Sequence, residues 1–213
     1  MARIPLFDAR TMSQAQAEVY EAVVRGPRGR LVGPLRAAMH NPVLADRWQR
    51  LGEVLRYDTV LPKRLSELAI LVTARRWNGQ LEWHIHADDA AKAGLQSTII
   101  DAIAAGEAPV FDDSEAWDIY TFARQMQLHG DVQEDVYERI HARWGTVGVV
   151  ELSSVIGYYT LVAMTLNVHR IPLPDEVKAP LQVATDAQCG LPRLTEPAPA
   201  VFQAGAHPAM GER

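Results

Sequence analysis

Residues 61–94, LPKRLSELAILVTARRWNGQLEWHIHADDAAKAG, decide the fold of this chain. Their pattern predicts two consecutive helices, Leu61–Arg76 and Gln80–Ala93, with a short turn between them. The first helix is apolar through its middle, from Ala69 to Val72, so it has no solvated side and should be buried. Because the turn is short, the two helices should pack antiparallel against each other.

Three ionisable side chains in this helix pair are candidates for chemistry. Glu67 lies just before the apolar run and should be carried into the interior, where a carboxylate needs a partner. Glu82 and His86 are four residues apart and therefore share one helix face. Counted from the turn, Glu67 and His86 lie at heights that differ by roughly 4–5 Å, so a hydrogen bond or a one-water bridge can join them. We expect all three side chains to converge on one partly closed pocket.

Spacing alone leaves a second interpretation of Glu82 and His86 open. Pairs of Glu and His four residues apart are common on helix surfaces, where they contribute a few tenths of a kcal/mol. A histidine held beside a buried carboxylate is, in contrast, well suited to transferring protons. The two interpretations differ in whether His86 faces solvent or a pocket.

Length, composition and charge predict a soluble protein. The 213 residues can bury a core without disulfides or metal, and 48% of them are hydrophobic and 22% charged. Acidic residues outnumber basic ones 26 to 21, which argues against nucleic acid or an anionic membrane as partner. The single cysteine, Cys189, excludes an internal disulfide and suits a reducing cytosol. The N-terminus has no apolar segment of signal-peptide length, and the apolar stretch 147–168 is interrupted by Glu151, so we expect a cytoplasmic protein of bacterial type.

The remainder of the chain predicts further helices and no strand. Helix starts are indicated by Ser13 with Gln16, Asn41-Pro42, Ser97 or Thr98, Asp131 with Glu134, and Gly145-Thr146. No stretch alternates apolar and polar residues for long enough to form a strand. We therefore predict an all-α fold with a single domain over residues 1–173. Residues 174–213 hold six of the 13 prolines and should form a tail or arm.

The segment GPRGRLVGP, residues 26–34, is a loop with special backbone requirements, because it contains three glycines and two prolines. One interpretation is a surface connector. The other is a loop that covers a pocket and offers Arg28 or Arg30 to an anion.

Two further residues of the helix pair are candidates for substrate binding. Arg75 lies near the end of the first helix, where a cation stabilises the C-terminus, and it could also clamp a substrate carboxylate. Trp83 lies next to Glu82 and is either a core residue or part of a pocket wall. Glu82 with His86 could supply two metal ligands, but no spacing typical of a metal site completes the set, so no metal is expected.

The segment from Glu67 to Gly94 resembles the carboxymuconolactone decarboxylase family, whose superfamily also contains alkylhydroperoxidase D. In that family an acid on a buried helix is followed by a turn and by a second helix with a histidine, small residues and a glycine. Glu67, His86 and Gly94 fall at the matching places. In the peroxidase branch the second helix begins with Cys-x-x-Cys, and here those two positions hold Gly79 and Glu82.

The pattern Glu82-Trp83-x-x-His86 instead resembles the decarboxylase branch, so thiol-dependent peroxide reduction is not expected. The resemblance implies an alkylhydroperoxidase D-like helical bundle with a buried central helix pair. It also implies a cofactor-free, carboxy-lyase-like enzyme that transfers a proton on a small acidic substrate, a carboxylated lactone or carbonyl compound. His86 would deliver the proton, Glu82 or Glu67 would orient the imidazole, and an arginine would hold the acid.

A homo-oligomer is also expected, from the resemblance and from the small residues Ala87, Ala90 and Ala91, which permit close helix packing. This expectation leads to an alternative from a different class of protein. The chain could be a non-catalytic helical oligomer that keeps the scaffold and binds a ligand or partner. Loss of turnover on replacing His86 separates the enzyme from the scaffold.

Overall fold

The structure is a computed structural model that describes residues 2–182. Within them it is all-helical, with the helices packed against one another and no strand, as the sequence predicted. The helices are α1 (Gln14–Arg25), α2 (Leu35–Ala38), α3 (Pro42–Tyr57), α4 (Lys63–Arg76), α5 (Gln80–Lys92), α6 (Ser97–Ala105), α7 (Ser114–His129) and α8 (Glu134–His169), preceded by a 3-10 turn, η1 (Ala9–Thr11).

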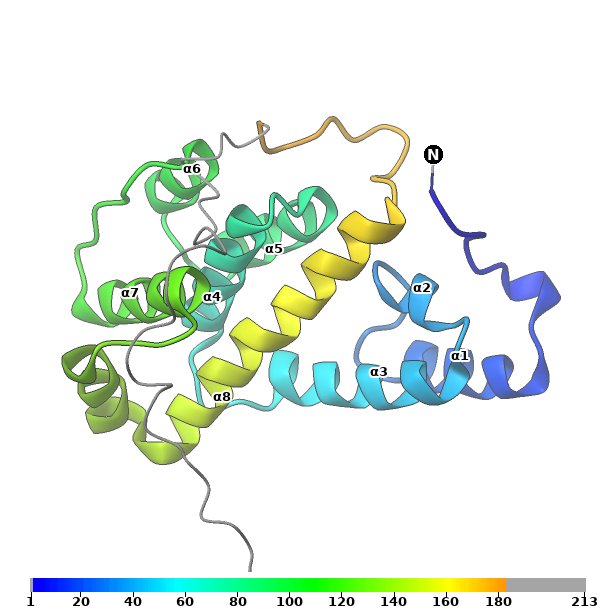
Figure 1. The fold of residues 1–213 in the computed structure, drawn as a ribbon, viewed down its shortest axis with the longest axis horizontal. Coiled ribbons are helices and arrows are strands. Elements are labelled where there is room, and N and C mark those ends of the chain that lie inside the picture. The colour runs from blue at the N-terminus through cyan, green and yellow to red at the C-terminus, as the bar shows by residue number, and fades with distance from the viewer. Residues whose placement is uncertain (1, 183–213) are drawn as a thin grey trace, which may run out of the picture.

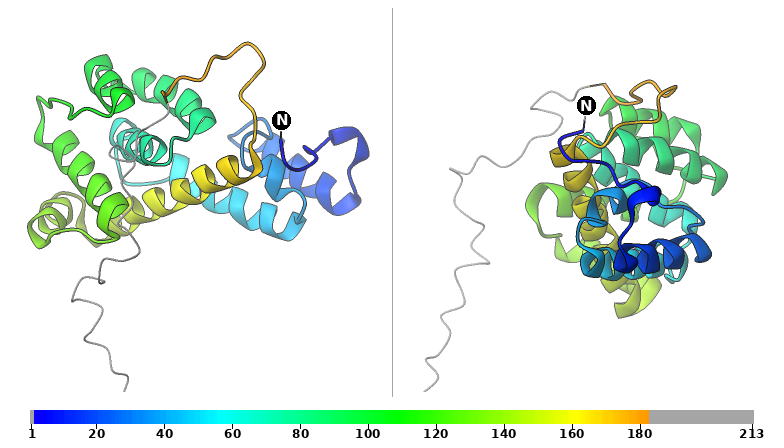
Figure 2. Two further views of the ribbon diagram at one scale, coloured as in Figure 1. Left: turned by 45° about the horizontal axis from the view of Figure 1, so that its top comes forward. Right: turned by 90° about the vertical axis from the view of Figure 1, so that its right-hand side faces the viewer.

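Helix α8 runs diagonally through the molecule, with α4 to α7 on one side and α1 to α3 on the other (Figures 1 and 2). The hydrophobic core has two corresponding clusters. One is built from α4 to α7 and part of α8. The other is built from α1 to α3 and the later turns of α8, and Ile70 of α4 also joins it. Helices α4 and α8 therefore connect the two clusters.

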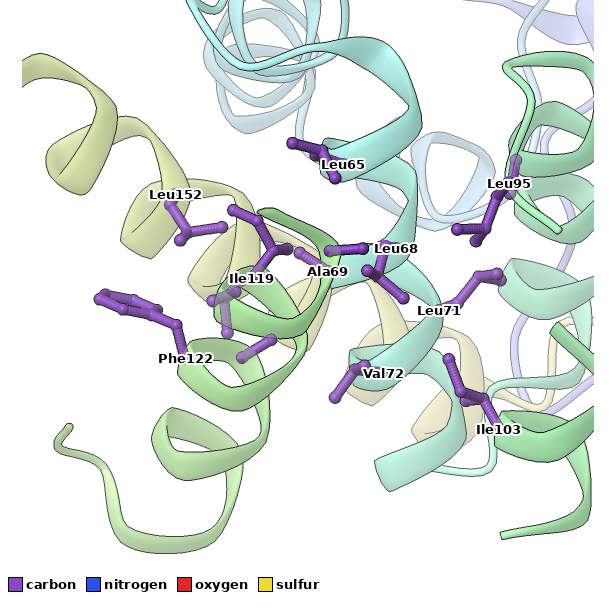
Figure 3. Packing of buried hydrophobic residues seen from close by; sticks show 14 of the residues in the cluster. Leu65, Leu68, Ala69, Leu71, Val72, Leu95, Ile103, Ile119, Phe122 and Leu152 are labelled. Atoms are coloured by element: carbon purple, nitrogen blue, oxygen red, sulfur yellow. The ribbon is translucent and has the colours of Figure 1, made fainter. Parts of the chain in front are cut away.

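Helix α4 is the buried centre that the sequence predicted. All of its residues from Leu65 to Arg76 are buried. Figure 3 shows Ile119 and Phe122 of α7 on one side of α4, together with Leu152 of α8, and Ile103 of α6 on the other. Apolar neighbours on both sides explain why the helix has no solvated face.

Two of the predicted helix starts are confirmed by the bonds that their caps make. The Ser13 hydroxyl accepts from the Gln16 N–H, and the Gln16 side chain accepts from the Ser13 N–H, which is the predicted capping box. Asn41 caps α3 with its side-chain oxygen, and Pro42 follows as the first helical residue.

Two other predicted caps are wrong. The cap of α8 is Gln133 rather than Asp131, because the Asp131 carboxylate accepts from the N–H of its own neighbour instead. Ser97 is the first residue of α6, and the cap position before it holds Gln96 without a side-chain bond. The short helix α2 was not predicted, since four residues are too few to show a helical period.

Helix α8 contains both of the helices predicted between Glu134 and His169, with a kink where they meet. Gly145, at the kink, has φ 66° and ψ −171°, a backbone conformation that glycine adopts readily. By length and composition α8 could cross a membrane, but half of its most apolar window is buried inside the protein. This burial fits the core helix of a soluble protein.

The predicted tail or arm, residues 174–213, is described only from 174 to 182, and Cys189 lies outside the described residues. Leu181 is buried, and its N–H and C=O both bond the side chain of Gln80 at 2.9 Å. Arg75 donates from Nη1 to the carbonyl oxygen of Gln182 at 3.2 Å. The described part of the tail is therefore attached to the α4–α5 turn.

Candidate functional site

The turn between α4 and α5 sets the geometry of the candidate site. Asn78 has φ 50°, a left-handed conformation that asparagine tolerates better than most residues, and the Gly79 N–H donates to the Ala74 carbonyl at 2.8 Å. The chain thus reverses within three residues, and α5 returns along α4. This return brings Glu67 of α4 opposite His86 of α5.

Glu67 and His86 form a buried hydrogen bond, as the helix heights predicted. Glu67 Oε2 lies 2.7 Å from His86 Nδ1, and the two side chains are 0% and 5% exposed. The other Glu67 oxygen, Oε1, lies 2.5 Å from Lys63 Nζ. Burial alone raises the pKa of Glu67, but attraction to His86 and Lys63 and the bonds with them bring it below its ordinary value. Glu67 is therefore a buried carboxylate anion.

Because the carboxylate holds Nδ1, the Nε2 atom of His86 is left for other partners, and His86 lines a cavity. The ring edge also meets Tyr159 of α8 at 4.7 Å between ring centroids and an interplanar angle of 83°. Burial raises the pKa of Tyr159 well above its ordinary value, so its hydroxyl keeps the proton. The imidazole is thus held on one side by a carboxylate and on another by an aromatic ring.

Glu82 lies one turn before His86 in an entirely different environment. Its side chain is buried, and neither carboxyl oxygen has a hydrogen-bond partner among the described residues. Burial raises the pKa of Glu82 well above its ordinary value and so favours the neutral carboxylic acid. It makes no contact that would orient His86, and that predicted role belongs to Glu67 alone.

The cavity lies between α5, α8, α3 and the loop of residues 26–34, and it has a volume of about 40 Å³. This is room for about three water molecules. The lining residues are Arg28, Val32, Gly33, Pro34, Leu35, Arg56, Leu81, Glu82, Ile85, His86, Tyr158, Tyr159, Val162 and Leu166. Glu82 and His86 thus open onto one space, while Glu67 reaches it only through His86.

Two arginines line the cavity opposite α5. Arg28 comes from the loop of residues 26–34, which therefore covers a pocket, and its Nη2 donates to the Tyr158 hydroxyl at 3.4 Å. Arg56 of α3 lies 2.5 Å from the Asp89 carboxylate and is paired with it. The other loop arginine, Arg30, is exposed and does not line the cavity.

The two residues predicted to bind substrate lie elsewhere. Trp83 packs in the core cluster around α4, because its position on α5 turns it toward α4 and away from the cavity. Arg75 binds Asn78 and Gln182, at the end of α4 far along the helix from Glu67. Arg28 and Arg56 supply the cavity's cations instead.

Tyr158, Tyr159 and Arg56 were not singled out from the sequence. They belong to α3 and α8, and nothing in the local pattern of either helix relates it to α5. The signal that could have found the tyrosines is weak: two adjacent aromatic hydroxyls in the apolar later half of α8.

Glu67, His86 and Asp89 together form a group with metal-ligand chemistry, since one donor atom of each lies within 4.8 Å of the others. Each carboxylate in the group already has a cation, Lys63 for Glu67 and Arg56 for Asp89. A divalent ion would have to displace both, so the expectation of no bound metal stays our prediction. Metal analysis of the purified protein tests it.

No protein-family model and no curated protein matches this chain. The resemblance of residues 67–94 to the carboxymuconolactone decarboxylase family therefore stays a prediction from the residues themselves.

Proposed function

We propose that this protein is a proton-transfer enzyme of carboxy-lyase type that acts on a small carboxylated lactone or carbonyl compound without a cofactor. The observation that carries the proposal is the Glu67–His86 pair, a buried carboxylate hydrogen-bonded through Nδ1 to an imidazole that lines the cavity. The resemblance of residues 67–94 to carboxymuconolactone decarboxylases supports the same reaction class.

The proposed reaction begins with the bond between carbon and the departing carboxylate. As this bond breaks, carbon dioxide leaves and the electron pair passes into the conjugated carbonyl group, giving an enolate. His86 then delivers its Nε2 proton to carbon and takes a new proton from solvent. Glu67 accepts the Nδ1–H throughout, so it fixes the ring orientation and stabilises the positive charge that His86 carries before the transfer.

Glu82 takes the role of hydrogen-bond donor in this reaction. A carboxylic acid that burial keeps neutral can donate its proton to a developing enolate oxygen in a dry site. The sequence had suggested Glu82 as an orienting group for His86. Because the Glu82 carboxyl group makes no side-chain hydrogen bond with His86, direct action on the substrate is favoured.

The test uses the full chain, acetoacetate and small carboxylated lactones in D2O. NMR measures carbon dioxide loss and deuterium incorporation at the carbon that lost it. His86→Gln should lower the rate by about 100-fold or more, the usual contribution of a general acid. His84→Gln, two residues away and outside the cavity, should stay within about twofold of the parent chain. Equal rates in the two variants would contradict the role of His86.

The alternative, a non-catalytic helical oligomer, predicts no turnover above buffer for any of these compounds. Cytoplasmic location likewise stays a proposal, supported by the burial of α8 and by the acidic net charge.

Assembly also stays a prediction, and its expected basis needs correction. Ala90 is fully buried within the chain and packs in its own core, so it cannot contact another subunit. We still propose a homo-oligomer, and sedimentation that gives a mass near 23.6 kDa at micromolar concentration would contradict it.

A further inference from the structure

Arg28 is a cation without a matching anion at the wall of the cavity. Its Nη2 donates to the Tyr158 hydroxyl, and its Nε is buried without a partner. No carboxylate among residues 2–182 forms an ion pair with it, whereas the neighbouring cavity arginine, Arg56, is paired with Asp89. A guanidinium that is half-buried and lacks a counter-ion favours binding an anion.

The charges around the cavity also favour an anionic ligand. Arg56 and Asp89 cancel, as do Lys63 and Glu67 behind His86. Glu82 is neutral because of its burial. Arg28 is thus the one cation on the described lining that no carboxylate accompanies, because Glu67 is hydrogen-bonded to His86 and Asp89 is paired with Arg56. A single negative charge would balance it.

Helix α3 has a glycine, Gly52, where Arg28 and Tyr158 pack against it. A Cβ atom on Gly52 would lie 2.0 Å from the Tyr158 hydroxyl oxygen and 2.2 Å from Arg28 Nη2. Only glycine leaves room for these two groups at their observed positions. A glycine inside a helix lowers the stability of that helix. Its presence at position 52 is therefore consistent with a requirement for the close approach of Arg28 and Tyr158.

Glu82 is an independent indication that the cavity takes a polar ligand. Both of its carboxyl oxygens are buried and unpartnered, and the side chain lines the cavity across from the loop of residues 26–34. Buried polar groups are nearly always satisfied by a hydrogen bond. A ligand that offers an oxygen to this acid would satisfy it.

We propose that the cavity binds the carboxylate of a short organic acid, with two to four carbons, through Arg28 and the Tyr158 hydroxyl. The oxygen at the other end of the acid, a carbonyl, would accept from Glu82 and lie beside His86. The size follows from a volume equal to about three water molecules, so of the two substrate classes in the proposed function the cavity suits a short carbonyl acid such as acetoacetate rather than a carboxylated lactone. The orientation toward His86 rests on the proposed function, whereas the anion site itself does not.

Acetate is the probe for the anion site, because it fits the volume and cannot react. Its affinity for the full chain is measured by isothermal titration at constant ionic strength. Acetate should bind with a Kd on the order of 1 mM, and acetamide, its neutral counterpart, should bind at least tenfold more weakly. Benzoate, which is too large for the cavity, should not bind.

Arg28→Gln should weaken acetate binding at least tenfold, because it removes a charge-assisted hydrogen bond. Arg30→Gln is the matched control: it removes the same charge from the same loop, but from an exposed side chain outside the cavity. It should leave the affinity within twofold. If Arg28→Gln does not fold, Tyr158→Phe replaces it and should weaken binding two- to fivefold.

Three results would overturn the anion site: no acetate binding to the parent chain, equal affinity for acetamide and acetate, or equal losses in the Arg28 and Arg30 variants. Failure of the proposed function gives a different pattern. Acetate binding without any turnover that depends on His86 would support the anion site and contradict the proposed enzymatic function.

Discussion

Glu67 and Glu82 are the same amino acid, buried to the same degree, on two helices that face each other. At Glu67 the side chains of His86 and Lys63 attract and hydrogen-bond the carboxylate and lower its pKa, whereas at Glu82 nothing compensates for burial and the pKa rises well above its ordinary value. The difference shows that burial alone does not decide the charge of a carboxyl group. The presence of partners does.

The position of Glu82 in its helix makes the contrast sharper. Glu82 lies in the first turn of α5, and its Oε2 is only 3.0 Å from where a Cβ on Gly79 would stand. A helix N-terminus stabilises a negative charge by about 0.3–1 kcal/mol. Removing an unpaired charge from water costs several kcal/mol, so desolvation exceeds the helix contribution and the proton stays.

The largest expected effect comes from replacing each acid with methionine, which has a similar shape and no charge. Glu67→Met should lower the free energy of unfolding by about 3 kcal/mol, because it leaves the buried His86 Nδ1–H without an acceptor and removes the ion pair with Lys63. Glu82→Met should raise it by about 1 kcal/mol, because it removes an unsatisfied buried polar group. Urea unfolding at pH 7 measures both.

The test is that the two variants change the free energy of unfolding in opposite directions. Methionine brings the same side chain to both positions, so a general effect of the substitution would move both in one direction. Two losses of similar size would mean that Glu82 has a partner and is not neutral.

The pH dependence of stability should differ between the two acids with a slope of about 1.4 kcal/mol per pH unit. Glu82 has a raised pKa, so the folded state holds a proton that the unfolded state releases above the ordinary value for Glu. Its contribution is complete below that value and is lost as the pH rises towards the folded pKa. Unfolding of the parent chain and Glu82→Gln, from pH 5 upward, should therefore diverge, with the variant gaining relative stability.

Glu67 should act in the acid range with the reverse sign. Its pKa is lowered, so its contribution is present above the ordinary value for Glu and is lost as the pH falls through the folded pKa. Glu67→Gln should reduce the loss of stability at acid pH, which we call the acid limb of the stability curve. It should leave the loss of stability above pH 5, the alkaline limb, unchanged. An alkaline limb that changes in Glu67→Gln but not in Glu82→Gln would reverse our assignment of the two charge states.

Gly52→Ala tests the packing of Tyr158 and Arg28, two residues that line the cavity with Glu82, against α3. The new methyl group would collide with the Tyr158 hydroxyl, and its overpacking should exceed the gain in helix propensity by about 1 kcal/mol. Gly157→Ala in α8 is the control, because nothing lies within 4 Å of its new Cβ, and it should stabilise the protein. Thermal unfolding compares the two, and equal gains would mean that Tyr158 and Arg28 are not packed on α3.

Much of the fold and half of the site could be predicted from the sequence, and the reason is locality. The helix pair α4–α5 has its own period, its own turn and a fixed rise per residue, so the distance from Glu67 to His86 followed from counting residues. The glycine at 145 predicted the start of a new helix, and the structure has a kink within α8 at that residue. Each of these depends on fewer than about 30 consecutive residues.

The other half of the cavity could not be predicted, because it depends on how distant helices meet. Tyr158 of α8 meets Arg28 of the loop, 130 residues away in the chain, through a gap left by Gly52. The protonation state of Glu82 could not be predicted for the same reason. Its position on the face of His86 was evident, but the lack of any partner is a property of everything packed around it.

The smallest expected effect concerns Lys63, the second cation at Glu67. Its side chain is 41% exposed, so water screens the pair, and Lys63→Met should lower the free energy of unfolding by only about 0.5 kcal/mol at pH 7. The pKa of Glu67 should rise somewhat, which moves the acid limb of stability to higher pH. Lys92→Met, which breaks an exposed pair with Asp88 at the same spacing, should leave that limb in place. A loss as large as that of Glu67→Met would mean that Lys63, rather than His86, is the partner that keeps Glu67 charged, and the contrast with Glu82 would then depend on a surface lysine.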